Sequence, residues 1–76
     1  MDYEEIKEII EVGDVIQIAA PYVAGVGQVA KLLPKTIVID PYKKSGYEGD
    51  SLPETAVIQL SDIHMFFLLK PDFNNE

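Results

Sequence analysis

After Gly13 the apolar segments of this chain are strand-like, and glycine or proline lies at or near the edges of most of them. Within these segments, apolar and polar residues alternate over short stretches, as they do in strands that bury one face. "DVIQIAA" and "KTIVID" follow this pattern, and a polar loop is predicted over 41–54. The pattern predicts five short strands: 14–20, a second that begins within 21–28 and ends near 33, 35–40, 55–60 and 65–69.

The first twelve residues have the pattern of a short amphipathic helix. Asp2 is a favourable N-cap, and Glu5 can complete a capping box with it. Ile6, Ile9 and Ile10 recur at helical spacing, so the helix is expected to close the open end of a core. A helix and five bent strands are too little for a two-sheet sandwich, and they predict a mainly β fold, a strongly bent small barrel. The chain of 76 residues is predicted to form one domain, with the helix over 1–12, the strands within 13–70 and a tail over 71–76.

The run "HMFFLL" is apolar on both faces of its predicted strand. Met65, Phe67 and Leu69 project to one side, and the alternate residues project to the other. A core of this size buries one set, and the other set would be an aggregation hazard on an edge strand. Pairing this edge with the fourth strand of a second copy covers it, and repetition of that contact closes a homo-oligomeric ring. The predicted subunit interface consists of Val57, Ile58, Phe66 and Leu68.

The charge of the chain is unevenly distributed. The net charge is −7, with −5 over residues 1–14, +3 over 15–47 and −5 over 48–76. All the cationic side chains are lysines, and arginine, the usual bidentate reader of phosphate and guanine, is absent. This balance disfavours a protein that wraps nucleic acid, but it permits a small focused binding site.

The residue types needed for catalysis are sparse. The chain has no cysteine, so disulfides and thiolate metal sites are excluded. His64 is the only histidine, and no serine has a recognisable base and orienting partner. We therefore expect no enzyme activity, no catalytic residue, no cofactor and no metal site. No apolar run is long enough to cross a bilayer and the N-terminus is acidic, so a cytoplasmic protein is predicted.

Two segments resemble the sequence motifs of the Sm/LSm family, which includes the bacterial Hfq proteins. "GQVAKLLPKTIVID", residues 27–40, resembles the first Sm motif, and "IQLSDI", residues 58–63, stands in the place of the second. The chain also resembles divergent Sm-like proteins carried by marine cyanophages, for which the location would be the host cytoplasm. The resemblance implies an N-terminal helix, five bent strands, a closed ring and single-stranded RNA bound at the pore.

The residues that hold uridine in typical family members differ here. Leu33 and Thr36 replace an aspartate and an asparagine of the first motif, and Gln59 with Leu60 replaces the Arg-Gly of the second. RNA contact is therefore expected to depend mainly on Lys35 in the predicted turn between the second and third strands. The predicted RNA-binding residues are Lys35, Thr36, Gln59, Ser61 and His64. A secondary surface that pairs aromatic rings with cations, as single-strand binding requires, is predicted at Tyr42, Lys43, Lys44 and Tyr47.

A second resemblance leads to a different function. Residues 12–40, "VGDVIQIAAPYVAGVGQVAKLLPKTIVID", also resemble a KOW segment, in which a Gly-Asp strand and a glycine turn lead into further strands. This resemblance implies an SH3-like structural or protein-interaction barrel without a nucleic-acid role. The acidic balance argues against a ribosomal-RNA clamp, and "HMFFLL" has no role in a monomeric barrel of that kind.

Overall fold

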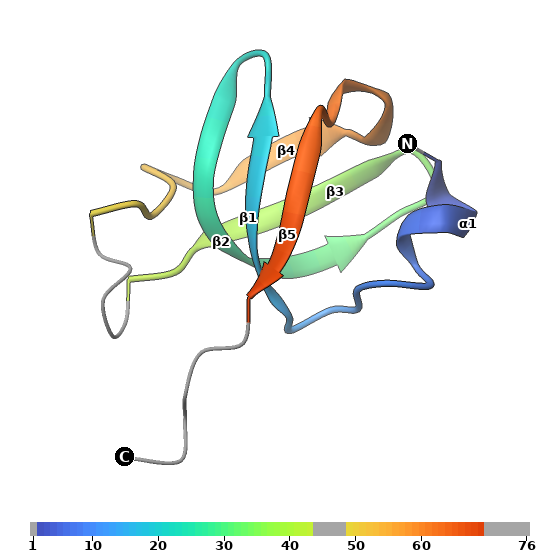
Figure 1. Ribbon diagram of the computed structural model, residues 1–76, viewed down its shortest axis with the longest axis horizontal. Helices are drawn as coiled ribbons and strands as arrows, with labels where there is room; N and C mark the ends of the chain where they lie inside the picture. The colour runs from blue at the N-terminus through green and yellow to red at the C-terminus, as the bar shows by residue number, and fades with distance from the viewer. Residues whose placement is uncertain (1, 44–48, 70–76) are drawn as a thin grey trace.

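The computed structural model describes residues 2–43 and 49–69 (Figure 1). A short helix is followed by five antiparallel strands in the order β4-β3-β2-β1-β5, which confirms the predicted mainly β fold. Among the described residues β4 and β5 do not pair with each other, so the sheet bends without closing. The elements are α1 (Tyr3–Ile6), β1 (Val15–Ala20), β2 (Val23–Leu32), β3 (Thr36–Pro41), β4 (Ala56–Gln59), the 3₁₀ helix η1 (Leu60–Asp62) and β5 (Met65–Leu69).

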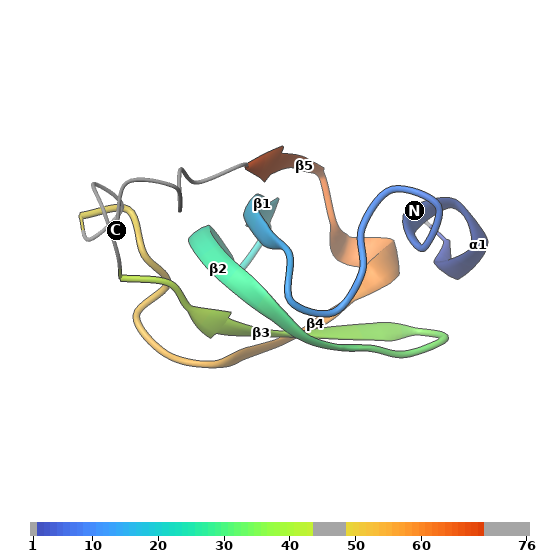
Figure 2. The ribbon, with the colours of Figure 1, turned by 90° about the horizontal axis from the view of Figure 1, so that it is seen from below.

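The long strand β2 bends the sheet into two layers. Its first part pairs with β1 and its second part with β3, so that β1 and β5 lie above β3 and β4 in Figure 2. The register shifts between Val29 and Lys31, which marks a bulge.

Gly25 has φ of +151°, a backbone conformation that favours glycine. At Gly27 a Cβ atom would overlap Ile39 and lie 2.7 Å from the carbonyl oxygen of Asp40. Gly25 and Gly27 therefore permit the strong curvature and the close approach of segments at this part of β2.

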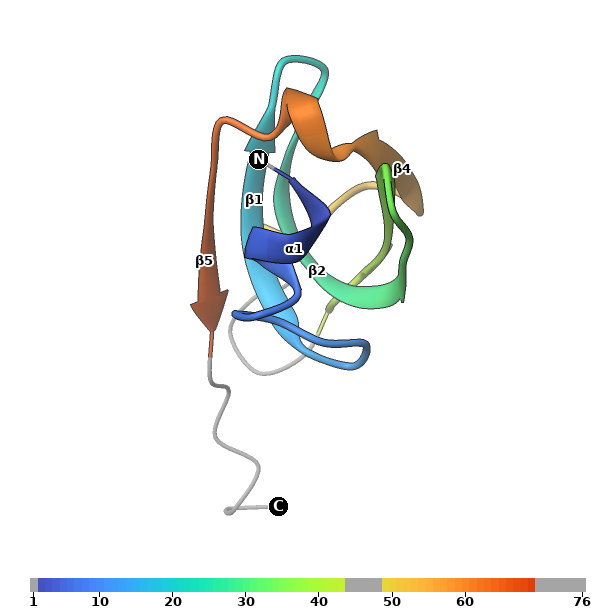
Figure 3. The same cartoon turned by 90° about the vertical axis from the view of Figure 1, so that its right-hand side faces the viewer.

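The core lies between the two layers and consists mainly of isoleucine. One face of each strand supplies it, because alternate side chains of a strand point to opposite sides. The fully buried members from the strands are Ile16, Ile18, Val29, Ile37, Ile39 and Ile58. Ile6 and Ile10 add to this cluster from the N-terminal segment, and Figure 3 shows α1 in front of one end of the bent sheet.

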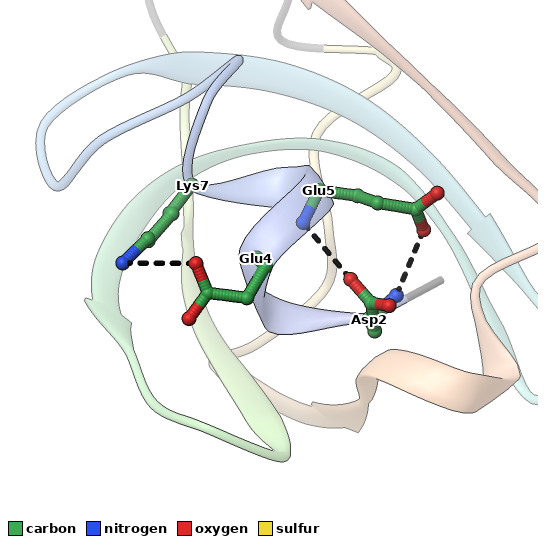
Figure 4. A network of polar contacts seen from close by, with 4 residues as sticks. All are labelled: Asp2, Glu4, Glu5 and Lys7. Atoms are coloured by element: carbon green, nitrogen blue, oxygen red, sulfur yellow. Dashed lines mark hydrogen bonds and ion pairs between the residues drawn. The ribbon is translucent and has the colours of Figure 1, made fainter.

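The capping box at the start of α1 is present as predicted (Figure 4). The backbone N–H of Glu5 donates to the Asp2 carboxylate at 2.9 Å, and the backbone N–H of Asp2 donates to the Glu5 carboxylate at 3.3 Å. One turn later, Lys7 Nζ lies 3.2 Å from a carboxylate oxygen of Glu4. The box satisfies backbone donors that the first turn of a helix leaves without intrahelical partners.

The predicted length of this helix is wrong. The helix ends at Ile6 instead of continuing to residue 12, and Ile9, expected in the core, is exposed. A single turn is not stable by itself, so packing decides where it ends. The turn that follows α1 brings Ile6 and Ile10 together into the core. No helix in the described part of the chain is long and apolar enough to cross a membrane.

Replacing Asp2 with Ala is expected to lower the free energy of unfolding by about 1 kcal/mol, the usual effect of losing an N-cap. Glu4→Ala is the matched control, because it removes a carboxylate from the same turn without breaking the capping box. Its exposed ion pair contributes about 0.5 kcal/mol or less. Urea unfolding measures both changes, and an equal loss in the two variants would contradict the capping role.

The predicted polar loop over 41–54 contains an ordered, partly buried segment. The N–H of Val26 donates to the Asp50 carbonyl at 2.8 Å, and the N–H of Leu52 donates to the Val26 carbonyl at 2.9 Å. Residues 50–52 thus continue the sheet beside β2, at the part of β2 that β3 does not reach. Leu52 is fully buried in the core. The prediction of a solvated loop is therefore wrong for this segment.

Candidate nucleic-acid interface and subunit edges

The β2–β3 turn and the β4–η1 junction form a hollow of about 300 Å³, lined by Lys35, Gln59, Leu60 and Ser61. The N–H of Leu60 donates to the Lys35 carbonyl at 2.9 Å, which joins the two segments. Thr36 stands opposite Gln59 in the β3–β4 register. Four of the five predicted RNA-binding residues are therefore neighbours, although they come from segments well separated in the sequence.

The hollow presents one ammonium group, one amide and one hydroxyl to solvent. Lys35, Gln59 and Ser61 are all exposed, so a ligand can reach them without any rearrangement of the core. An ammonium suits a phosphate oxygen, whereas the amide and hydroxyl can donate to or accept from a base edge or a ribose. The described residues include no group of three His, Cys, Asp or Glu side chains that could hold a metal ion. The groups that line the hollow can bind a ligand through charge and hydrogen bonds.

His64, the fifth predicted residue, is not part of this lining. It follows η1, and its backbone N–H donates to the Ala19 carbonyl at 2.9 Å, which places it beside the end of β1. Its side chain is exposed. Asp62, which lies between Ser61 and His64 in the chain, accepts a hydrogen bond from the Tyr22 hydroxyl at 3.1 Å.

The predicted secondary surface requires correction at Tyr42. This side chain is only 5% exposed and belongs to a small cluster with Val15 and Val26 on the outer face of the sheet. A buried ring cannot stack on a nucleic-acid base, so it cannot act as predicted. Lys43 is exposed, and Lys44 and Tyr47 lie outside the described residues.

Strands β4 and β5 are the two edges of the sheet, each paired on one side only in the described part of the chain. Exposed apolar side chains accompany both edges: Val57 on β4 is 64% exposed, and Met65 and Phe67 on β5 are 52% and 56% exposed. Met65 and Phe67 also border an apolar hollow of about 100 Å³ over β1 and β2. Exposed edges with apolar flanks are the usual sites of strand addition.

The structure corrects two residues of the predicted subunit interface. Ile58 is fully buried in the core of its own subunit, so its side chain cannot contact a neighbour. Phe66 packs against the same core because it stands opposite Ile18 in the β1–β5 register. Val57 and Leu68 are exposed, and their role in a contact between copies stays a prediction.

Met65 and Phe67 are the exposed residues that the predicted interface omitted. The alternation in "MFFLL" separates two sets of side chains, but it does not indicate which set faces the core. Pairing with β1 decides this, since Phe67 stands opposite the exposed Gln17. The polar residue Gln17 indicates which face of β1 meets solvent. This assigns Phe67 to the same face only when the register between β1 and β5, which are far apart in the chain, is known.

Comparisons of the chain with protein-family models, curated proteins and solved structures found no match. The function is therefore inferred from the residues and their geometry.

Proposed function

We propose that this chain is a non-catalytic, Sm-like protein that assembles into a closed homo-oligomer and binds single-stranded RNA. The observation that carries the proposal is the hollow where Lys35, Gln59 and Ser61 meet. The two segments that resemble the Sm motifs, residues 27–40 and 58–63, both contribute residues to this hollow. The resemblance includes the divergent Sm-like proteins of cyanophages. It combines a cation for phosphate with polar groups for a base or a ribose.

The two different sheet edges support the assembly. When β4 of one copy pairs with β5 of the next, the contact is head-to-tail, and such contacts form a ring if the rotation closes. Val57 beside one edge and Phe67 beside the other supply apolar surface for the contact. Closure would place one copy of Lys35 from every subunit around a common axis. A local positive potential would then arise on a protein whose net charge is −7.

The expected mode of RNA binding is dominated by phosphate contacts. Lysine binds phosphate as a point charge, and the hollow has no guanidinium for bidentate recognition of a base. We therefore expect weak discrimination between oligo-U and oligo-A, and affinity that decreases with salt. On single strands the logarithmic slope is about 0.7 for each neutralised phosphate.

Lys35→Ala is expected to weaken binding of oligo-U and to reduce the steepness of its salt dependence by about 0.7 for each lost contact. Lys7→Ala is the matched control, because Lys7 is an exposed lysine at the end of α1 and belongs to neither the hollow nor the secondary surface. Fluorescence anisotropy over a salt series measures the affinity and the slope. The Lys7 variant is expected to retain the wild-type values.

Equal losses in the two variants would indicate nonspecific attraction to lysine and would contradict a site at the hollow. If neither oligo-U nor oligo-A binds at low salt, the alternative function, a KOW-like interaction module without a nucleic-acid role, is the better one. In that case the apolar outer face around Met65 and Phe67 would be the surface for a different protein partner.

A further inference from the structure

Tyr22 connects three parts of the fold at the open edge of β4. It lies in the short turn between β1 and β2, and its hydroxyl donates to Asp62 Oδ2 in η1 at 3.1 Å. The same hydroxyl accepts a hydrogen bond from the backbone N–H of Gln59 at 3.4 Å. The contacts span 40 and 37 positions of the chain, so they are tertiary contacts that nothing in the local sequence requires.

The backbone N–H of Gln59 points toward the free edge of the sheet. On the other side of β4, the N–H of Leu60 donates to the Lys35 carbonyl next to β3. Successive N–H groups of a strand point in opposite directions, so that of Gln59 faces away from β3. This is the donor that an added strand would use.

The ring of Tyr22 also stands beside the path of an added strand. Tyr22 remains 57% exposed, so little packing holds it in place. A groove of about 280 Å³ runs along this part of the molecule, and Tyr22 forms one of its walls. The other lining residues are Val23, Pro53, Glu54, Thr55, Ala56 and Val57.

We propose that Tyr22 is a latch on the β4 edge, which covers the Gln59 N–H in the free subunit and is displaced when β5 of a second copy pairs there. This inference rests on the proposed assembly and adds the group that regulates it. The Gln59 N–H is the group for which both compete: it bonds either to the phenol or to a carbonyl of the incoming strand. At 3.4 Å the bond to the phenol is long, so the latch opens readily. In the free subunit the latch occupies the Gln59 N–H and so makes uncontrolled strand addition at β4 less favourable.

Tyr22→Phe tests the latch because it keeps the ring and removes both hydrogen bonds. The variant is expected to assemble at a subunit concentration about fivefold lower than wild type, the effect of one modest competing hydrogen bond. Tyr3→Phe is the matched control, since it makes the same chemical change on α1. Sedimentation velocity over a dilution series gives the subunit concentration at which half of the protein is assembled. If wild type stays assembled at every dilution, the urea concentration at half dissociation is measured instead, and Tyr22→Phe is expected to raise it.

Asp62→Ala provides a second variant, because it removes the acceptor that orients the phenol while leaving Tyr22 in place. It is also expected to assemble at a lower concentration than wild type. With wild type assembled, an unchanged or higher concentration midpoint for Tyr22→Phe, or an unchanged or lower urea midpoint, would overturn the latch but leave the proposed assembly intact. If every variant and the wild type stay monomeric at all concentrations, the assembly fails and the latch fails with it.

Discussion

Phe67→Lys is expected to dissociate the proposed assembly into folded subunits, whereas Phe66→Lys is expected to destabilise the fold of the subunit itself. The two residues are adjacent in β5 and differ in the face they occupy. Phe66 packs against the core opposite Ile18, and a lysine there would bury a charge or leave a cavity. Phe66 is partly buried, so the expected loss of stability is at most about 3–5 kcal/mol, the range for truncation of a fully buried phenylalanine.

Phe67 is 56% exposed, so a lysine at this position is solvated in the free subunit. In the proposed assembly the same lysine would lie beside the apolar contact with β4 of the next copy. Loss of a central aromatic contact typically costs about 2 kcal/mol or more, which is at least an order of magnitude in affinity. A closed assembly repeats this loss at every contact.

Circular dichroism measures folding in these variants, and sedimentation velocity measures assembly. Val12→Lys is the control, because it places the same charge on an exposed apolar residue outside the sheet. The control is expected to remain folded and assembled. If Phe67→Lys assembles as wild type does, β5 is not part of the contact between copies.

Leu52→Ala is expected to lower the free energy of unfolding by about 2–5 kcal/mol, the usual effect of truncating a fully buried leucine. Leu52 has no exposed surface, and it lies beside Gly27, where the sheet approaches it most closely. The whole stability of a domain is about 5–15 kcal/mol, so this single loss would be a large part of it. Total burial therefore makes this position critical, although it belongs to a segment rich in polar residues.

Leu33→Ala is the matched control for this prediction, because it is the same substitution at a leucine that is 42% exposed. We expect it to lower stability by less than about 1 kcal/mol, since much less apolar area leaves water when it folds. Urea unfolding of both variants at equal concentration measures the difference. Similar losses for the two leucines would show that residues 50–52 do not pack against β2 as described.

The predicted RNA-binding set illustrates what could be derived from local pattern. Lys35 and Thr36 are close in the sequence, and Gln59 and Ser61 are close to each other, so each pair was visible within its own segment. That the pairs meet depends on the β3–β4 register. The resemblance to the Sm motifs supplied this pairing in advance. No local feature indicated that His64 would stand apart from the hollow.

The sequence by itself determined the strand pattern and the capping box, because each follows from interactions among residues near one another in the chain. Alternating polarity specified the strands, and Asp2 with Glu5 specified the start of α1. Only the tertiary structure decided where α1 ends, that Leu52 enters the core and that Phe66 rather than Phe67 faces inward. These outcomes depend on contacts between segments distant in the chain. Local pattern cannot distinguish two faces of a strand that are equally apolar, and the register with β1 can.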